Sequence, residues 1–511
     1  MTQGEIEKLT VKTQNIFSRL EIRIMQDIIR RIKENGFVTA SADWQISRLK
    51  QLGESEQTIR QLIQDALVAS DEELERIFSD EVYEEYYGHA HAYEIAGVQQ
   101  IPYEENEALQ RTVEVMKLQL RGEYQNLTGS MGFAIRGADG LIKYSPVMSF
   151  YRTTLDNAVA DIHSGAFDYN TVLKRTVTTL TNSGLRHIDY ESGHRDRVDV
   201  AVRRAVLTGF RQVQGKINEQ VAVELHTDMY EVTYHVGARP SHQPWQGRVW
   251  SMEQLQSVCG LGTGPGLKGW NCYHDYRPFP SGSIRTYTDE WLDAMTAKEN
   301  TPKWYGDSEY TTYEALQQQR RMERTMRAQR QKIKLLKEGD ADPKDILLAK
   351  ARYQGQMQNY AKFSKCMELP EQRQRIMQDG LRGRFMPTQK EQKALEESAR
   401  TAKIKAGMKL AGMRGEIDLT PTIPKVSKLS FDEHHINQER HHNVTEDEAK
   451  SYIQNALFST TKWKGKFTNY YSAEGAAFVN NETQQIRTAF KKGQYDKETV
   501  AAMEVFKRGR T

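Results

Sequence analysis

Cysteine is scarce in this sequence. Only Cys259, Cys272 and Cys366 occur among 511 residues, and such an odd, sparse set gives no disulfide framework and favours a reducing compartment. No run approaches the roughly 18 apolar residues of a membrane-spanning helix. The opening residues MTQGEIEKLTVKTQ lack the apolar stretch of a signal peptide. We therefore expect a soluble protein that is made in a cytoplasm and has no membrane partner.

A large excess of charge of one sign is also missing, because the net charge is only +3. This balance argues against a protein that coats nucleic acid along its whole length. The charge is uneven, however, since residues 304–415 hold 24 Lys and Arg against 14 Asp and Glu. That segment is suited to contact with phosphate or with an acidic protein surface.

The length exceeds what one ordinary core accommodates, and the pattern is mainly helical. Apolar residues recur at helical spacing over 1–35, and 196–226 has the pattern of one more long helix. Residues 227–290 are rich in Gly, Pro, His and aromatic residues, which favours short strands and turns. The predicted fold class is mainly α with α+β parts. Five parts are expected: a helical N-terminal region (1–184), a compact α+β domain (185–300), a basic helical segment (301–411), a linker (412–430) and a small α+β domain (431–511).

The last part has its own predicted elements. We expect a helix at 445–457, strands at 466–471 and 476–480, and a final helix from 496 onward. Pro421 and Pro424 make 412–430 the best linker candidate, because proline ends helices and lacks the donor that strand pairing needs.

Four residues of metal-binding type lie in the turn-rich segment: His235, His242, Cys272 and His274. They form an H-x6-H and a C-x-H pair, and imidazole and thiolate are the ligands that Zn²⁺ prefers. A structural zinc ion would explain how a turn-rich segment keeps its shape. Zinc ribbons usually separate paired ligands by two to four residues, so C-x-H is unusually tight. The alternative is that these side chains form hydrogen bonds to backbone and that no cofactor is bound.

The nearby run GLGTGPGLKGW resembles a phosphate-binding loop only superficially. It lacks the Lys-Ser/Thr ending and the strand–loop–helix frame of such loops. Gly260, Gly262, Gly264 and Gly266 are better interpreted as turn glycines.

The turn-rich segment contains two unusual runs, HVGARPSHQPWQGRVW and CGLGTGPGLKGWNCYHDYRPF. Together they resemble the signature of the phage minor capsid protein 2 family, a head-morphogenesis family related to the Mu F type. The residues that carry the resemblance are Gly237, Ala238, Arg239, Pro240, His242, Trp245, Gln246, Gly247, Gly260, Gly262, Gly266, Leu267, Gly269, Asn271, Cys272 and His274. The run TASADWQISRLKQLG (39–53) is similar to the family's early helix pair, and the resemblance spans about 1–300. Leu261 departs from the tyrosine often found before the GTG turn.

This resemblance implies a structural protein of a tailed-phage or prophage head, present in few copies and retained at or near the portal vertex. The implied partners are the portal protein and the major capsid protein. The implied location is the virion, with the host cytoplasm during assembly. The basic helices of 304–411 would then be candidates for contact with packaged DNA, although a charge run is more often a solvated face.

The C-terminal part carries a second set of candidate residues. His434, His435, His441 and His442 flank Glu439 and Arg440 in FDEHHINQERHH. Metal-free RNA cleavage needs a base, an acid and a cation for the phosphorane charge, and His, Glu, Arg and Lys supply these groups near neutral pH. Lys462, Lys464 and Lys466 around Trp463 would offer a phosphate-binding and base-stacking surface.

Over about 431–505 the sequence is similar to small phage-borne nucleases of the barnase/EndoU/colicin/RelE-like class. The similarity lies in the order of its residues, H…R-H…V-T-x-E…I-R-T-A-F…Y-D. The resemblance implies His441, Arg440, Thr488 and Tyr495 as catalytic residues, with His435 as an alternative to His441, and RNA as the substrate. The HHINQERHH run is too compact for a His-Asn-His metal nuclease. A non-catalytic module that binds another head protein is the competing interpretation, and so is a nuclease effector delivered with the virion.

Overall fold

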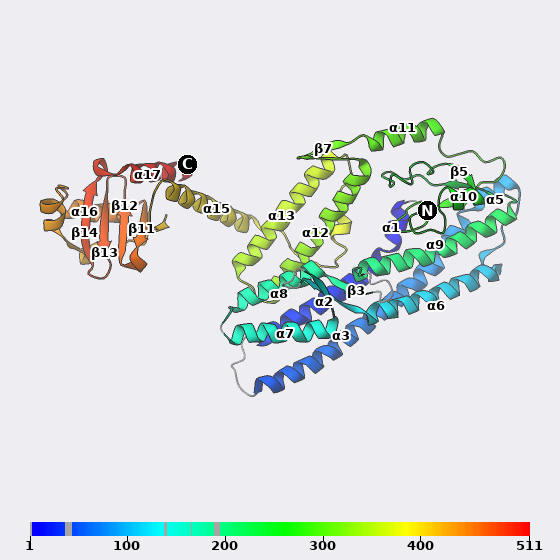
Figure 1. Ribbon diagram of the computed structural model, residues 1–511, viewed down its shortest axis with the longest axis horizontal. Helices are drawn as coiled ribbons and strands as arrows, with labels where there is room; N and C mark the ends of the chain where they lie inside the picture. The colour runs from blue at the N-terminus through cyan, green and yellow to red at the C-terminus, as the bar shows by residue number, and fades with distance from the viewer. Residues whose placement is uncertain (1–2, 36–42, 137–140, 165, 189–194, 511) are drawn as a thin grey trace. The chain divides into compact units, whose positions relative to one another are not determined.

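The computed structural model describes residues 3–35, 43–136, 141–164, 166–188 and 195–510, and it divides into two compact units. Unit 1 is 1–387 and unit 2 is 388–511 (Figure 1). The described chain is mainly helical, with small sheets in unit 1 and an α+β arrangement in unit 2, which confirms the predicted fold class. Within the described ranges, no helix combines the length and apolar character needed to cross a membrane.

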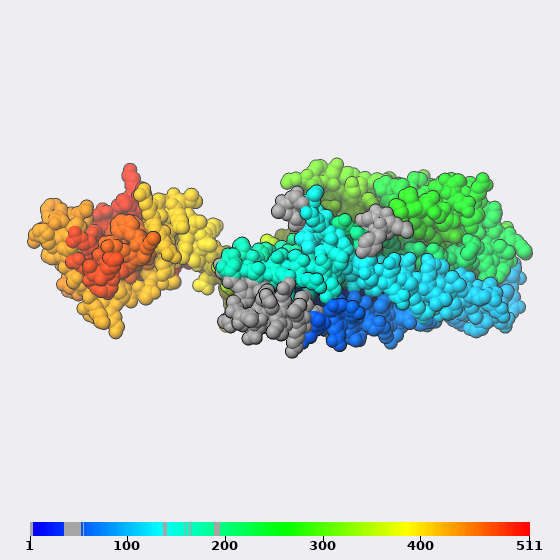
Figure 2. All heavy atoms as spheres, turned by 60° about the horizontal axis from the view of Figure 1, so that its bottom comes forward, coloured from blue at the N-terminus to red at the C-terminus, as the bar shows by residue number. Residues whose placement is uncertain are grey.

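Unit 1 is a helical assembly around one continuous apolar core. Its helices are α1 (Gln3–Leu9), α2 (Val11–Asn35), α3 (Asp43–Arg76), η1 (Ile77–Glu81), α4 (Val82–Tyr87), α5 (Ala90–Ala96), η2 (Tyr103–Glu105), α6 (Glu107–Gly129), α7 (Val147–His163), α8 (Tyr169–Ser183), α9 (Val198–Glu224), α10 (Met252–Ser257), α11 (Asp289–Asn300), α12 (Thr312–Glu338), α13 (Pro343–Cys366) and α14 (Arg373–Ile376). Helix α2 is central, because its residues Phe17, Ile24 and Ile28 are buried and it packs against α3, α7, α9 and α12. Figure 2 shows α3 and α6 side by side on one face of this unit. Residues 39–42, which begin the early helix pair expected from sequence, lie outside the described ranges.

Strands occur in unit 1 where the chain leaves its helices. They are β1 (Met131–Arg136), β2 (Ile142–Pro146), β3 (Leu185–His187), β4 (Met229–Val232), β5 (Val249–Ser251), β6 (Tyr276–Pro278), β7 (Lys303–Tyr305) and β8 (Ser308–Tyr310). In the sheet β2-β1-β3, strands β1 and β2 lie in the region 1–184 that the sequence predicts as helical. There β1 pairs with both neighbours and packs Phe133 against Phe150 of α7, so tertiary contacts favour the strand over the local helical pattern.

Helix α12 packs inside unit 1, although it lies in the basic segment that the sequence suggested for contact with phosphate or an acidic protein surface. It is buried because its polar side chains find partners: Gln331 donates to Glu21, Arg330 pairs with Asp379, and Tyr360 donates to Glu323. Paired polar groups can be buried at little net cost. Three cations of α12 form ion pairs within the unit: Arg327 with Asp199, Arg330 with Asp379 and Lys334 with Glu338.

The carboxylate of Glu21 connects four segments of unit 1. It accepts hydrogen bonds from the Leu185 backbone at 2.7 Å, from Arg197 at 2.7 and 2.8 Å, and from Gln331 at 3.0 Å. Its side chain is only 4% exposed. These hydrogen bonds fix the relative positions of helix α2, strand β3, the start of α9 and helix α12.

Unit 2 is a mixed sheet with helices on both faces. Its elements are α15 (Gln389–Leu410), β9 (Glu416–Asp418), η3 (Val426–Lys428), β10 (Ser430–Phe431), η4 (His434–Glu439), α16 (Glu446–Gln454), β11 (Phe458–Lys462), η5 (Trp463–Gly465), β12 (Phe467–Tyr471), β13 (Gly475–Asn480), β14 (Gln485–Lys491), η6 (Lys492–Gln494) and α17 (Lys497–Arg510). The strand order is β10-β14-β13-β12-β11-β9, with only the β10–β14 pair parallel. Helices α15 and α17 cover one face, while η4 and α16 cover the other.

The start of unit 2 differs from the boundary expected at 431. Strand β9 pairs with β11, so the expected linker 412–430 carries an edge strand of the sheet. Gly412 and Gly415, both with positive φ, form the turn that leads from α15 into β9. Ile404 and Met408 of α15 are buried with Phe506 of α17, which places 389–410 in unit 2 rather than in the basic helical segment.

We predict that Glu21→Ala lowers the free energy of unfolding of unit 1 by about 3–5 kcal/mol, because it leaves partly buried Arg197 without its main partner. Urea unfolding of the full chain, followed by circular dichroism, measures the change. Glu34→Gln on the same helix is the matched control, since Glu34 is 43% exposed and pairs with Arg31 only at 3.5 Å. A loss below about 1 kcal/mol for Glu21→Ala would contradict this role.

Candidate functional site

Three of the four predicted metal ligands of unit 1 lie together. The ligand atoms of His242, Cys272 and His274 are all within 4.8 Å of one another, and the three side chains are buried. His242 Nδ1 is 3.4 Å from His274 Nδ1, and Cys272 Sγ is 3.4 Å from the same nitrogen. We call these residues the His-Cys triad.

Local backbone structure places the triad. The backbone N–H of Gln246 donates to the backbone oxygen of His242 at 3.1 Å, which closes a helical turn. The side chains of His242 and Gln246 therefore lie on the same face of that turn. Cys272 and His274 are two residues apart in the segment that leads into β6, and alternate residues of an extended chain point the same way. His274 therefore lies between His242, Gln246 and Cys272.

Hydrogen bonds on the outer nitrogens fix the two ring orientations. His242 Nε2 lies 2.7 Å from Pro265 O, and His274 Nε2 lies 2.9 Å from Gln246 Oε1. A backbone carbonyl accepts only, so His242 carries its proton on Nε2. Gln246 Oε1 also accepts from the His235 amide at 3.2 Å, which identifies it as the oxygen and makes His274 Nε2 a donor as well.

Burial keeps the triad neutral. Burial, and next the neighbouring His235 and His242, lower the pKa of His274 well below its usual value. Burial also lowers the pKa of His242 and raises the pKa of the Cys272 thiol. The groups therefore enter any chemistry at neutral pH as two imidazoles and a thiol.

His235 does not join the triad. Its ring lies against that of His274 with 4.1 Å between centroids, but its Nδ1 is directed to Val236 O at 3.3 Å. Burial lowers the pKa of His235 to about 4. Of the four residues singled out in the sequence, the structure thus brings three into ligand geometry and places His235 against their rim.

The glycines beside the triad form tight turns, as expected. A Cβ on Gly266 would meet Gly260 O at 2.1 Å, and a Cβ on Gly269 would meet Gly264 O at 2.2 Å. The turns let the Trp270 amide donate to Gly264 O at 2.7 Å. They support the wall around Cys272 and show no phosphate-loop frame.

A basic cavity of about 490 Å³ adjoins the triad and was not predicted from sequence. Tyr273 lies on its wall, where its hydroxyl accepts from Arg203 at 2.8 Å and Arg320 at 3.4 Å. His242, Cys272 and His235 also line it. The arginines Arg203, Arg239, Arg320 and Arg324 line it without an ion pair to any described carboxylate. The signal in the sequence was the spacing of Arg320, Arg324 and Arg327, which places them on one face of α12.

Two of the cavity's other arginines are paired. Arg375 pairs with Glu7 at 2.5 Å and Arg327 with Asp199 at 3.3 Å. Burial and the positive charges of Arg327, Arg321 and Arg320 lower the pKa of Arg324. The cavity therefore holds an excess of positive charge that favours an anionic group.

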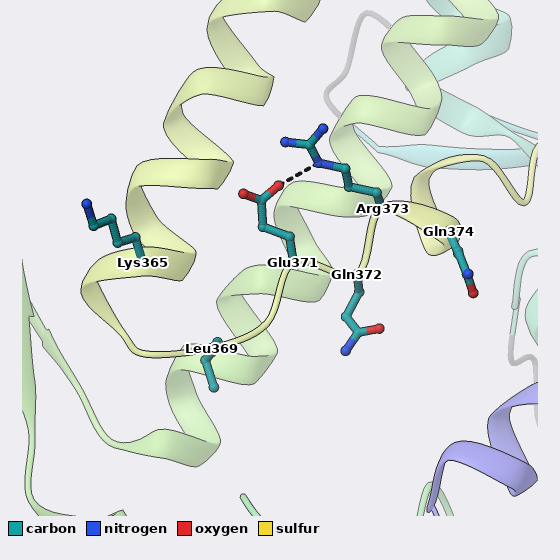
Figure 3. Close-up of a pocket in the computed structure, with 6 residues that line it drawn as sticks. All are labelled: Lys365, Leu369, Glu371, Gln372, Arg373 and Gln374. Carbon is teal, nitrogen blue, oxygen red and sulfur yellow. Dashed lines mark hydrogen bonds and ion pairs between the residues drawn. The ribbon is translucent and has the colours of Figure 1, made fainter.

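A second, more open hollow of about 830 Å³ lies at the turn between α13 and α14. Figure 3 shows its lining residues, in which Arg373 pairs with Glu371 at 2.7 Å while Lys365, Leu369 and Gln374 point in different directions. Because its polar groups do not converge, it offers no candidate site.

In unit 2, the predicted catalytic residues lie in two stretches of the chain, on and just after η4 and from β14 to the residue after η6. His435 Nδ1 lies 2.6 Å from Glu439 on η4, and that hydrogen bond lowers the pKa of Glu439. Arg440 and His441 follow on the surface, and His441 adopts a left-handed backbone with φ of 55°. His442 packs its ring 5.6 Å from Phe490.

Thr488 and Tyr495 lie elsewhere. Thr488 pairs across the sheet with Phe478, on the face that α15 and α17 cover. The Tyr495 hydroxyl donates to Ser472 O at 3.0 Å, and burial raises its pKa. Among the described contacts, none joins Thr488 or Tyr495 to His435, Arg440 or His441.

The hairpin tip of η5 presents the predicted stacking surface. Trp463 is 71% exposed, and its ring lies 5.1 Å from that of Phe467. Lys464 is exposed, whereas Lys462 is half-buried and Lys466 pairs with Glu482 at 2.8 Å. An exposed aromatic ring beside lysines fits a nucleic-acid or protein contact equally well.

Comparison with known families gives one match. The model of the family described as phage minor capsid protein 2 matches residues 1–362, which include the His-Cys triad and most of the cavity. No curated protein and no solved structure matches the chain. The match ends within α13, so it covers most of unit 1 and none of unit 2.

We predict that Gln246→Leu lowers the free energy of unfolding by about 2–4 kcal/mol, because His274 Nε2 and the His235 amide lose their shared acceptor in a buried place. Chemical unfolding of the full chain measures the loss. Gln256→Leu, on the exposed side of α10, makes the same chemical change and should alter stability by less than about 0.5 kcal/mol. Equal effects of the two substitutions would contradict the assigned hydrogen bonds.

Proposed function

Because the chain belongs to the phage minor capsid protein 2 family, we propose that it is a structural component of a tailed-phage or prophage head, retained at the portal vertex, with unit 2 as an attached accessory domain. The observation that carries this proposal is the extent of the family match, which runs from the first residue through α12 and into α13. Unit 1 would bind the portal protein and the major capsid protein. The chain would be present in the virion and, during assembly, in the host cytoplasm.

The basic cavity supports a specific mode of attachment. Arginines without carboxylate partners lie around Tyr273, and a guanidinium group binds carboxylates and phosphates through paired hydrogen bonds. An acidic segment of the portal protein is the partner that this charge favours. Packaged DNA is the alternative partner, because a phosphate group would fit the same arginines.

We predict that chemical cross-linking of purified heads joins unit 1 to the portal protein, and that Arg320→Glu with Arg324→Glu reduces these cross-links at least tenfold. Reversing two charges in the cavity repels an acidic partner and leaves the paired arginines in place. Arg111→Glu is the matched control, because Arg111 is 72% exposed and pairs only within its own helix. Cross-links to the major capsid protein alone would rule out attachment at the portal.

A second candidate function, a ribonuclease activity of unit 2, is favoured by one observation. His435 and Glu439 form a hydrogen-bonded pair next to exposed Arg440 and His441, which supplies a base, an acid and a cation on one surface. Thr488 and Tyr495 are half-buried, and the Tyr495 hydroxyl donates to Ser472 O. Under this proposal the RNA would lie along η4.

For the ribonuclease proposal, we predict that residues 388–511 cleave RNA in the presence of EDTA, and that His435→Ala and His441→Ala each reduce the rate about 100-fold or more. This fragment is chosen because it contains the whole sheet together with α15. Arg508→Ala is the control, since Arg508 is 82% exposed on α17 and pairs with Glu504 of the same helix at 3.1 Å. A folded fragment without activity on total RNA and on tRNA would leave unit 2 as an interaction module.

A further inference from the structure

We propose that His242, Cys272 and His274 bind one divalent transition-metal ion of the Zn²⁺ class, through Nδ1 of both histidines and Sγ of the cysteine. This site is independent of the role proposed for the chain in the phage head. It also differs from the set expected from sequence, because His235 is not a ligand.

The separations of the ligand atoms match a metal centre. With Zn–N distances of about 2.0–2.1 Å and Zn–S of about 2.3 Å, neighbouring ligands of a tetrahedral ion lie about 3.3–3.6 Å apart. The measured separations are 3.4 Å between the two Nδ1 atoms and 3.4 Å between Sγ and His274 Nδ1. Two edges of the expected tetrahedron are therefore present before any ion is added.

The positions of the protons give an independent argument. Both Nε2 atoms are donors, to Pro265 O and to Gln246 Oε1, so both Nδ1 atoms present lone pairs to each other. The Cys272 thiol has one proton and can satisfy only one of them. The remaining lone pair faces another lone pair inside a buried cluster, an arrangement that a cation between the three atoms relieves.

A shared extra proton is the weaker solution. It would create a buried imidazolium in a cluster that already holds the guanidinium groups of Arg211 and Arg239, which donate to the carbonyls of Cys272 and Trp270. Metal binding instead releases the thiol proton to solvent and forms a metal–thiolate bond, so the ion's charge is partly neutralised by its own ligand. The outer hydrogen bonds to Pro265 and Gln246 are the second-shell contacts that commonly orient ligating histidines.

The ion would have three protein ligands and a fourth position open to the basic cavity, which His242 and Cys272 both line. Water or an anionic group from the cavity would complete the tetrahedron. The ion would tie the turn at 239–247 to the segment before β6. That connection is needed because 233–275 contains only the short elements β5 and α10 and a small apolar cluster.

Cobalt substitution of the full chain, purified without a histidine tag, tests the site. After removal of bound metal with a chelator, addition of Co²⁺ should give one equivalent of a thiolate-to-cobalt charge-transfer band in the near ultraviolet, together with visible bands of a tetrahedral ion. Unit 2 contains no cysteine, so its histidines cannot produce this charge-transfer band. Elemental analysis of the protein as purified should find about one zinc per chain.

Matched variants locate the ligands. Cys272→Ser should abolish the band, and His242→Ala should weaken Co²⁺ binding at least 100-fold. Cys259→Ser and His235→Ala should retain the band, because Cys259 is an equally buried cysteine outside the triad and His235 lies against His274 without ligating. No charge-transfer band in the wild-type protein, or a band that persists in Cys272→Ser, would overturn the proposal even if another variant failed to fold.

Discussion

The buried carboxylate of Glu21 sets the geometry on which the rest of unit 1 depends. It receives four hydrogen bonds from the Leu185 backbone, Arg197 and Gln331, and so joins the first long helix to a strand and two later helices. A buried charge is tolerated only when it is paired, so these segments must approach it together. Their arrangement in turn fixes α9 and α12, which carry the arginines Arg203, Arg211 and Arg320 that border the His-Cys triad.

The helices and the turn-rich segment were predictable because their signals are local. Apolar spacing predicted α2 and α9, and the glycines and prolines of 227–290 predicted short strands and tight turns. The burial of α12 could not be predicted, since it depends on polar partners far away in the sequence, such as Glu21 and Asp379. The same holds for β9, whose partner β11 lies some forty residues later, beyond two prolines that suggested a linker.

The candidate sites show the same limit. The sequence identified the residue types of the metal set, but spacing alone could not show that His235 turns to its own backbone region while His242 and His274 face each other. In unit 2, the motif order named Thr488 and Tyr495 together with the histidines, but an order of residues cannot show that Thr488 lies on the sheet face that α17 covers, or that Phe490 contacts both His442 and Tyr495. A base and an acid are adjacent only where they share η4.

In the proposed function, unit 1 attaches the chain to the phage head and unit 2 is a separately folded addition. The family match ends before unit 2 begins, and each unit has its own apolar core. The most direct measurement is the amount of the chain in purified, DNA-filled heads when only residues 1–387 are produced. We predict the same ratio to the major capsid protein as for the full chain. Loss of the truncated chain from otherwise normal heads would contradict it.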